Sequence, residues 1–316
     1  MSSRDLIAKP SRREALALTG ALSGAAAAGL AGLSPARAQS AAPSSGGPKT
    51  GGPKTGGYDY SDPVDNMHAT AKLMGDLTGA ACFFHAQGRV FGMMPDEHAR
   101  PLLDFEGCAA RKFAWDEETG DYLLSLREWL LFKDRETGEV VDEWENPYTR
   151  ESVSLPHFKG GGGEAAHRWT IYGQRRIGRE ALWADRGERV YDWLFDGDQA
   201  VATIDQYIAF PSFYPPERFP RASTGAIRWE LQVRTFHADR AALDDPEVTA
   251  TEGRETWVMK NSWMGFMNMG QWPGHHLWRA AGRKHLSLET LPEDFVARSE
   301  ARWPGLIDEF EAWAAG

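Results

Sequence analysis

Apolar and polar residues alternate with a period of two over much of the middle of the chain. The clearest run is AIRWELQVRTFHA, residues 226–238. One set of alternating positions is mostly apolar and the other is charged or carries an amide: Ile227, Trp229, Leu231, Val233 and Thr235 against Arg228, Glu230, Gln232 and Arg234. Side chains two residues apart on a strand point to the same side. The run therefore predicts a strand with one buried and one solvated face.

Turn signals between such runs predict antiparallel hairpins. Thr119-Gly120 and Thr137-Gly138 each sit between aromatic or β-branched runs, and a glycine there supplies the left-handed residue of a hairpin loop. We predict further turns at 185–188 and 196–198, and strands at 168–172, 181–184, 189–195, 201–210, 226–237 and 255–264. About ten strands without helical crossovers, with an aromatic-rich interior, favour a mainly β fold, an antiparallel meander forming a closed or nearly closed barrel.

Helical signals occur at the two ends of this β region. Asp62 followed by Pro63 is typical of a helix N-terminus, so we predict a short helix within residues 62–77. The segment LPEDFVARSEARWPGLIDEFEAW, residues 291–313, predicts a C-terminal helix interrupted at Pro304.

The N-terminal segment has the pattern of a targeting signal. Arg12-Arg13 precedes an uncharged stretch rich in Ala, Gly and Leu at 16–33, and Ala36-Arg37-Ala38 fits a small-residue cleavage site. The segment resembles a bacterial twin-arginine export signal. The alternative is a membrane anchor, which so many alanines and glycines disfavour. We expect cleavage after Ala38, no stable membrane span thereafter, and a periplasmic or secreted protein.

A flexible linker is predicted to follow the signal. Gly-Gly-Pro-Lys-Thr occurs twice in succession within residues 39–57, and this composition does not bury enough apolar surface to order a chain. The predicted organisation is a signal peptide at 1–38, a linker at 39–57 and a single β-barrel-like domain at 58–316.

Composition and charge exclude several classes of protein. The chain has 45 acidic against 35 basic residues, a net charge of −10, and no basic stripe, which disfavours nucleic acid or anionic membrane surfaces as partners. Two cysteines do not make a disulfide framework or a thiolate zinc site. Cys82 and Cys108 form either one disulfide or two buried thiols.

One strand carries a charge on each of its faces. In the run 123–132, Glu128 lies on one face and Arg127 on the other, each among apolar neighbours. A buried charge must be paired or neutralised. The simpler interpretation is a structural ion pair. The alternative is a carboxyl group in a cavity that serves as a general acid or base. In that case Arg127 or Arg111 is its charge partner, and His157 or His276 is the second acid–base group.

A second candidate region is rich in tryptophan and methionine. Such residues most often pack in a core. On the wall of a barrel they also form an adaptable pocket for a flat or flexible apolar ligand. The candidate ligand-binding residues, with Asn261 as the polar point, are Trp257, Met259, Asn261, Trp263, Met267 and Trp272.

No sequence signature indicates a metal or a cofactor. His275 and His276 are adjacent, so on a strand they point to opposite faces, and no HExxH motif, phosphate-binding loop or nucleophile elbow occurs. We expect no metal site, and the sequence identifies neither a cofactor nor an oligomeric state.

The stretch 106–157 resembles the domain-of-unknown-function family 1838. The matching positions are Glu106-Gly107, Arg111, Arg127-Glu128, Asp134, Thr137-Gly138-Glu139 and Trp144-x-Asn146-Pro147-x-Thr149. The resemblance extends over most of 58–313 and implies an exported bacterial protein, but no activity. The chain has Arg150 where the family is expected to have glycine, so we expect a different turn after Thr149. We interpret Trp144, Asn146 and Pro147 as structural.

Three functional hypotheses follow. The first is a periplasmic binding module that holds a small, largely apolar ligand inside the barrel. The alternative is an enzyme of isomerase, cyclase or hydrolase type that uses a buried Glu/His pair on a lipophilic substrate. The third is a cell-envelope interaction protein with an acidic exterior and a long tether.

Overall fold

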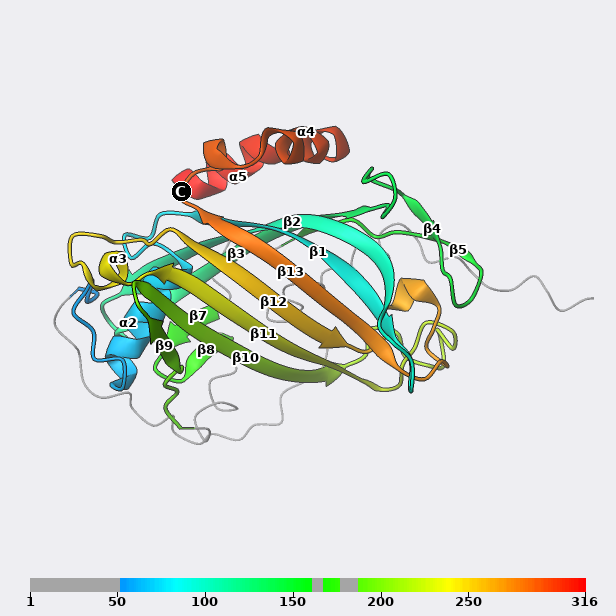
Figure 1. Cartoon of the computed structure of the whole chain (residues 1–316), viewed down its shortest axis with the longest axis horizontal. Coiled ribbons are helices and arrows are strands. Elements are labelled where there is room, and N and C mark those ends of the chain that lie inside the picture. Colours follow the sequence, from blue (N-terminus) through cyan, green and yellow to red (C-terminus); the bar gives the residue numbers. More distant parts are fainter. Residues whose placement is uncertain (1–51, 161–166, 177–186) are drawn as a thin grey trace, which may run out of the picture.

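A curled antiparallel sheet dominates the computed structural model, which describes residues 52–160, 167–176 and 187–316 (Figure 1). Within these residues, eleven strands form one sheet in the order β8-β7-β3-β2-β1-β13-β12-β11-β10-β9, with β6 also paired to β3. The sheet curls into a half-barrel, which confirms the predicted mainly β fold. The strands of this sheet are β1 (Cys82–Met93), β2 (Arg100–Asp116), β3 (Asp121–Lys133), β6 (Phe158–Gly160), β7 (His167–Thr170), β8 (Gly173–Arg176), β9 (Trp193–Asp196), β10 (Gln199–Pro211), β11 (Ile227–Asp239), β12 (Gly253–Asn261) and β13 (His275–His285).

Glycines make the predicted hairpin turns. Gly120 joins β2 to β3 with a φ of 68°, and Gly197 joins β9 to β10 with a φ of 59°. Gly138, with a φ of 73°, forms the third turn, but the chain then leaves the large sheet. It makes a separate hairpin, β4 (Glu143–Glu145) with β5 (Ser152–Ser154), before it returns to β3 as β6 and β7. The predicted strand at 181–184, the first half of the turn at 185–188, the predicted signal and most of the linker lie outside the described residues.

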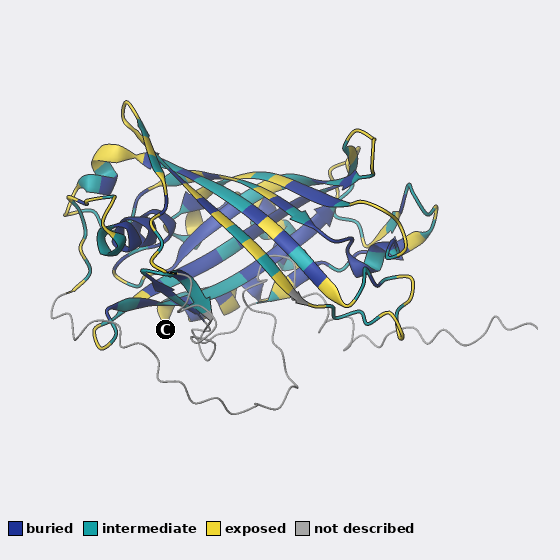
Figure 2. Cartoon of the chain, turned by 90° about the horizontal axis from the view of Figure 1, so that it is seen from below, coloured by how far each residue is buried: buried dark blue, intermediate teal, exposed yellow. Residues whose placement is uncertain are grey.

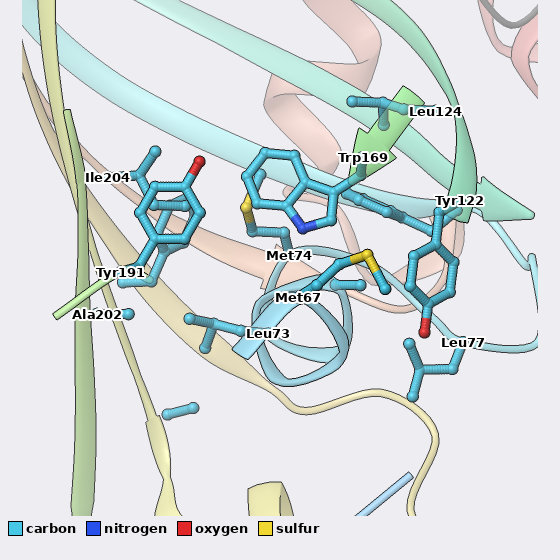
Figure 3. Packing of buried hydrophobic residues seen from close by; sticks show 14 of the residues in the cluster. Met67, Leu73, Met74, Leu77, Tyr122, Leu124, Trp169, Tyr191, Ala202 and Ile204 are labelled. Atoms are coloured by element: carbon cyan, nitrogen blue, oxygen red, sulfur yellow. The ribbon is translucent and has the colours of Figure 1, made fainter. Parts of the chain in front are cut away.

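Helix α2 (Pro63–Met74) closes one end of the half-barrel. The side chain of Asp62 accepts hydrogen bonds from the first backbone N–H groups of the helix, as the sequence predicts. Met67 and Met74 pack against Trp169 and other buried side chains of the sheet (Figure 3). At the other end of the helix, the buried Lys284 Nζ donates to the carbonyl oxygens of residues 72, 73 and 75. These bonds satisfy groups that a helix C-terminus leaves open.

The β4–β5 hairpin and the short helix η3 (Gly265–Met267) lie at the opposite end (Figure 1). The buried Asn146 donates to the Met267 carbonyl oxygen at 2.8 Å and accepts from the Tyr148 N–H at 3.0 Å, which supports the structural interpretation of this turn. Arg150 has a φ of 60°, the left-handed conformation that a glycine adopts readily. The backbone after Thr149 therefore keeps a glycine-like turn in spite of the arginine.

Helices α4 (Glu293–Arg302) and α5 (Leu306–Ala315) cover the outer face of β1–β3 (Figure 1). The break between them falls at Pro304, as predicted. Trp129 of β3 stacks on Phe295 with ring centroids 5.6 Å apart, meets Phe310 edge-on at 4.4 Å, and donates its indole N–H to Ser299 Oγ at 3.0 Å. The remaining short helices are α3 (Arg240–Asp244) and η4 (Leu288–Thr290).

Strand β11 shows that the inner face of the half-barrel is polar near its middle. Figure 2 shows how buried and exposed positions alternate along the strands. On β11 the buried positions include charged residues: Arg228 is 7% and Glu230 2% exposed, whereas Ile227 is 53% and Leu231 36% exposed. The strand therefore has one buried and one more exposed face, but its charged side faces inward and its apolar side faces outward.

Candidate functional site

A cavity lies on the concave side of the sheet, bounded by residues of β1, β2, β3, β11, β12 and β13. The cavity has a volume of about 70 Å³ and is partly open to solvent. On one side of the cavity lies the cluster of buried side chains around α2, which includes Met67 and Trp169. On the other side lies a methionine-rich cluster, which includes Met259, Met264 and Trp278. The cavity is thus a gap between two packed cores.

Small residues on adjacent strands form the floor of the cavity. Ala86 of β1 pairs with Gly107 of β2 on one side and with Gly282 of β13 on the other, and Ala109 and Ala280 extend this surface. A Cβ on Gly282 would lie 2.5 Å from a backbone oxygen, so the strands approach too closely there for any larger residue. The floor leaves space above the sheet that a row of larger side chains would fill.

Aromatic rings form the apolar part of the wall. Phe105 and Trp257 lie with ring centroids 5.6 Å apart, and Phe84 meets Phe236 edge-on at 5.8 Å. Phe84, Phe105 and Trp257 line the cavity. Such rings offer flat apolar surface to a ligand at a low cost in side-chain entropy.

An ion cluster occupies the polar part of the wall. Arg234 Nε donates to the carboxylate of Glu255, and Arg111 Nη2 lies 3.8 Å from the other oxygen of the same carboxylate. The Arg111 guanidinium also lies over the ring of Phe84, 4.2 Å from its centroid. Arg234, Glu255, Gln232 and Glu128 line the cavity. One carboxylate is therefore shared by two guanidinium groups.

A buried carboxyl group lies near the cavity on β11. Burial raises the pKa of Glu230 to about 7, against the lowering effect of a hydrogen bond from Gln232 and of the charge on Arg228, and the charge on Glu128 adds to the rise. Glu230 therefore changes its protonation state close to neutral pH.

The predicted acid–base residues do not come together. Glu128 lines the cavity, but Arg127 lies on the opposite face of β3, where its guanidinium lies 5.8 Å and 5.6 Å from the ring centroids of Phe310 and Trp313. Adjacent strand residues point to opposite sides, so this separation is inherent in the strand.

The two predicted histidines are also apart from Glu128. His157 Nδ1 accepts the Phe132 backbone N–H at 3.1 Å, and its Nε2 lies 3.2 Å from Asp142 Oδ1. Burial and the charge on Arg302 lower the pKa of His157. His276 is fully buried at the methionine-rich end, where burial and Arg228 lower its pKa well below the usual value. Neither histidine lines the cavity.

Of the predicted ligand-binding residues, Trp257 lines the cavity. Met259, Trp263 and Met267 belong to the packed cluster beside it, each at most 2% exposed. Asn261 is buried opposite Glu230 on the neighbouring strand. Trp272 is 41% exposed and lies 6.4 Å from the Tyr148 ring, away from the cavity.

Cys82 and Cys108 are free thiols. Cys82 pairs with Arg111 across the β1–β2 ladder, whereas Cys108 pairs with His85, three residues farther along. Three strand residues span roughly 10 Å, beyond the separation of about 7 Å that a disulfide can bridge. The two side chains also point to opposite faces. The disulfide alternative is therefore wrong for this structure.

The described part of the chain contains no cluster of three or more His, Cys, Asp or Glu side chains arranged to hold a metal ion. No helix within 52–160, 167–176 and 187–316 is both long and apolar enough to span a membrane.

The fold and the cavity define a half-barrel protein with a partly polar chamber between two cores. A family model described as "Protein of unknown function (DUF1838)" matches residues 79–310, and the chain belongs to this family. The match confirms the resemblance noted from the residues between 106 and 157. A comparison with curated proteins gave no match.

Proposed function

We propose that this protein is a binding module that holds a small, largely apolar molecule in the cavity of its half-barrel. The observation that carries this proposal is the cavity of about 70 Å³, partly open to solvent, between two otherwise close-packed clusters. Protein interiors normally leave few voids larger than a water molecule. A partly open space with aromatic walls and a few polar groups has the composition of a small-molecule site.

The floor and walls support binding of a flat apolar body. The small floor residues allow a ligand to lie directly on the sheet, and Phe105 and Trp257 offer ring faces beside it. Catalysis has less support. Arg127 lies on the other face of the sheet, and neither His157, which accepts a hydrogen bond from the β3 backbone, nor the fully buried His276 lines the cavity with Glu128.

The same proposal includes export. The Arg12-Arg13 pair, the weakly apolar stretch after it and the site at Ala36-Arg37-Ala38 support a twin-arginine signal cleaved after Ala38. Twin-arginine export delivers proteins already folded, so the half-barrel would reach the periplasm with its cavity formed.

A leucine at Ala280 is expected to block the cavity. Ala280 lies on the inner face beside Trp257. Its neighbour Ala281 also borders the cavity, but its exposed side chain points to the other face of β13. Ala280→Leu should weaken binding of the uncharged fluorescent lipophile N-phenyl-1-naphthylamine at least about tenfold, because the added side chain occupies the ligand's space. Binding is measured by saturable fluorescence enhancement.

Ala281→Leu is the matched control and should bind the dye as the wild type does. Circular dichroism of both variants establishes that the sheet is retained. Equal affinity for all three proteins, or no saturable binding to the wild type, would reject the proposal.

A further inference from the structure

On one side of the cavity, two guanidinium groups lie beside a single carboxylate. Arg111 and Arg234 approach the same carboxylate, that of Glu255. Among the described residues, Arg234 donates a hydrogen bond to Glu255 through Nε. Both of its Nη groups therefore remain available to a ligand. The Nη1 atom of the buried Arg111 has no hydrogen-bond partner among these residues, although buried polar groups are normally satisfied.

Arg234 is the most exposed residue of this cluster. The side chain of Arg234 is 23% exposed, whereas those of Glu255 and Arg111 are 7% and 3% exposed. A molecule that enters the cavity on this side therefore meets the Arg234 guanidinium before it meets the carboxylate. Guanidinium groups offer paired N–H donors that match the two oxygens of a carboxylate.

Two further carboxyl groups lie in or near the cavity, away from this carboxylate. Glu128 lines the cavity from β3 and has interactions of its own, and Glu230 is buried next to Gln232. The carboxylate that lies beside both guanidinium groups is that of Glu255.

We propose that the ligand is a lipophilic molecule with an anionic end group, a carboxylate or its equivalent. The anionic end lies against Arg234 with Arg111 behind it, and the apolar body lies between Phe84, Phe105 and Trp257. This inference rests on the proposed function and adds the chemical class of the ligand. It agrees with the geometry because the ion cluster and the aromatic rings line one continuous space.

Two dyes with the same ring skeleton test the charge preference. N-phenyl-1-naphthylamine is uncharged, and 8-anilinonaphthalene-1-sulfonate is a closely matched molecule with a sulfonate. The wild type should bind the sulfonate more tightly than the neutral dye. Arg234→Gln should weaken sulfonate binding at least about tenfold and leave the neutral dye within about twofold, because a charge-assisted hydrogen bond is lost.

Arg254→Gln is the control with the same change in net charge. Arg254 is exposed on the other face of the adjacent strand β12, so this variant should retain the sulfonate preference. Arg234→Lys keeps the positive charge and should therefore retain part of the preference for the sulfonate. Thermal unfolding shows whether each variant is folded.

The outcomes separate this inference from the proposed function. If neither dye binds to the wild type, the proposed function fails. A second outcome is that both dyes bind, that Ala280→Leu blocks both, and that Arg234→Gln leaves the ratio of their affinities unchanged. In that case the cavity binds ligands, but the anionic class of ligand is wrong. The inference is also overturned if Arg254→Gln and Arg234→Gln reduce the preference for the sulfonate by the same amount.

Discussion

Replacement of Glu106 by Gln is expected to destabilise the protein by about 3–5 kcal/mol, because it removes one partner of a buried ionic network. Glu106 of β2 is bonded to Arg298 of α4 on the outer face of the sheet and is 0% exposed. Its carboxylate is 2.9 Å from His85 Nε2, 3.0 Å from Gln87 Nε2, 3.2 Å from Lys133 Nζ and 2.7 Å from Arg298 Nη2. Arg298 belongs to α4, so the network fastens this helix to the sheet.

The network also predicts how stability depends on pH. Burial alone would raise the pKa of Glu106, but the hydrogen bonds from His85 and Arg298 and the charge on Lys133 lower it to about 2. A carboxyl whose folded pKa is depressed contributes stability above its unfolded pKa of about 4.3. That contribution is lost as the pH falls from about 4 towards 2, and Glu106→Gln should lack this part of the acid dependence.

Urea unfolding between pH 3 and pH 7 measures both effects. Asp104→Asn is the control, since Asp104 is on the same face of β2 and makes a more exposed pair with Arg89. Exposed pairs contribute little, so the control should lose no more than about 1 kcal/mol. Equal losses in the two variants would contradict the role assigned to the network.

Replacement of Glu230 by Gln is expected to stabilise the protein at pH 8 by about 3 kcal/mol and to change little at pH 5. Burial raises the pKa of Glu230 to about 7. A carboxyl with a raised folded pKa contributes most below its unfolded pKa of about 4.3, and that contribution is lost as the pH rises through 7. Glutamine resembles the protonated carboxyl and stays neutral, so the variant avoids the loss.

Thermal unfolding of wild type and variant at pH 5 and pH 8 tests this difference. Glu252→Gln, at an exposed pair with Arg283, should show no such dependence on pH. A Glu230→Gln variant that is less stable than the wild type at both pH values would contradict the account. A carboxyl kept at a cost to stability is typical of functional sites, where sequences depart from the most stable choice.

Local signals in the sequence were sufficient to locate some of the element ends, although the strands predicted at 168–172, 189–195 and 255–264 have other bounds in the structure. Asp62 and Pro63 mark the start of α2, Gly120 marks the β2–β3 turn and Pro304 separates α4 from α5. Each of these residues acts through its own backbone geometry or side-chain hydrogen bonds, so no tertiary context is needed to interpret it.

The position of the site depended on tertiary structure that a single strand does not encode. A period of two shows that the faces of β11 differ, but not which face the curled sheet encloses, and here the enclosed face is the charged one. Trp263 and Met267 indicated a pocket but pack in a core. The cavity depends instead on Ala and Gly residues, such as Ala86 and Gly107, that come together only through strand pairing.

The most direct test of the central claim is native mass spectrometry of the protein isolated from the periplasm after its own export. We predict a mass above that of the chain by one small organic molecule, released on denaturation, and no such excess for Ala280→Leu isolated in the same way. A wild-type protein that carries the mass of the chain alone, or an excess that Ala280→Leu retains in full, would contradict a ligand in the cavity.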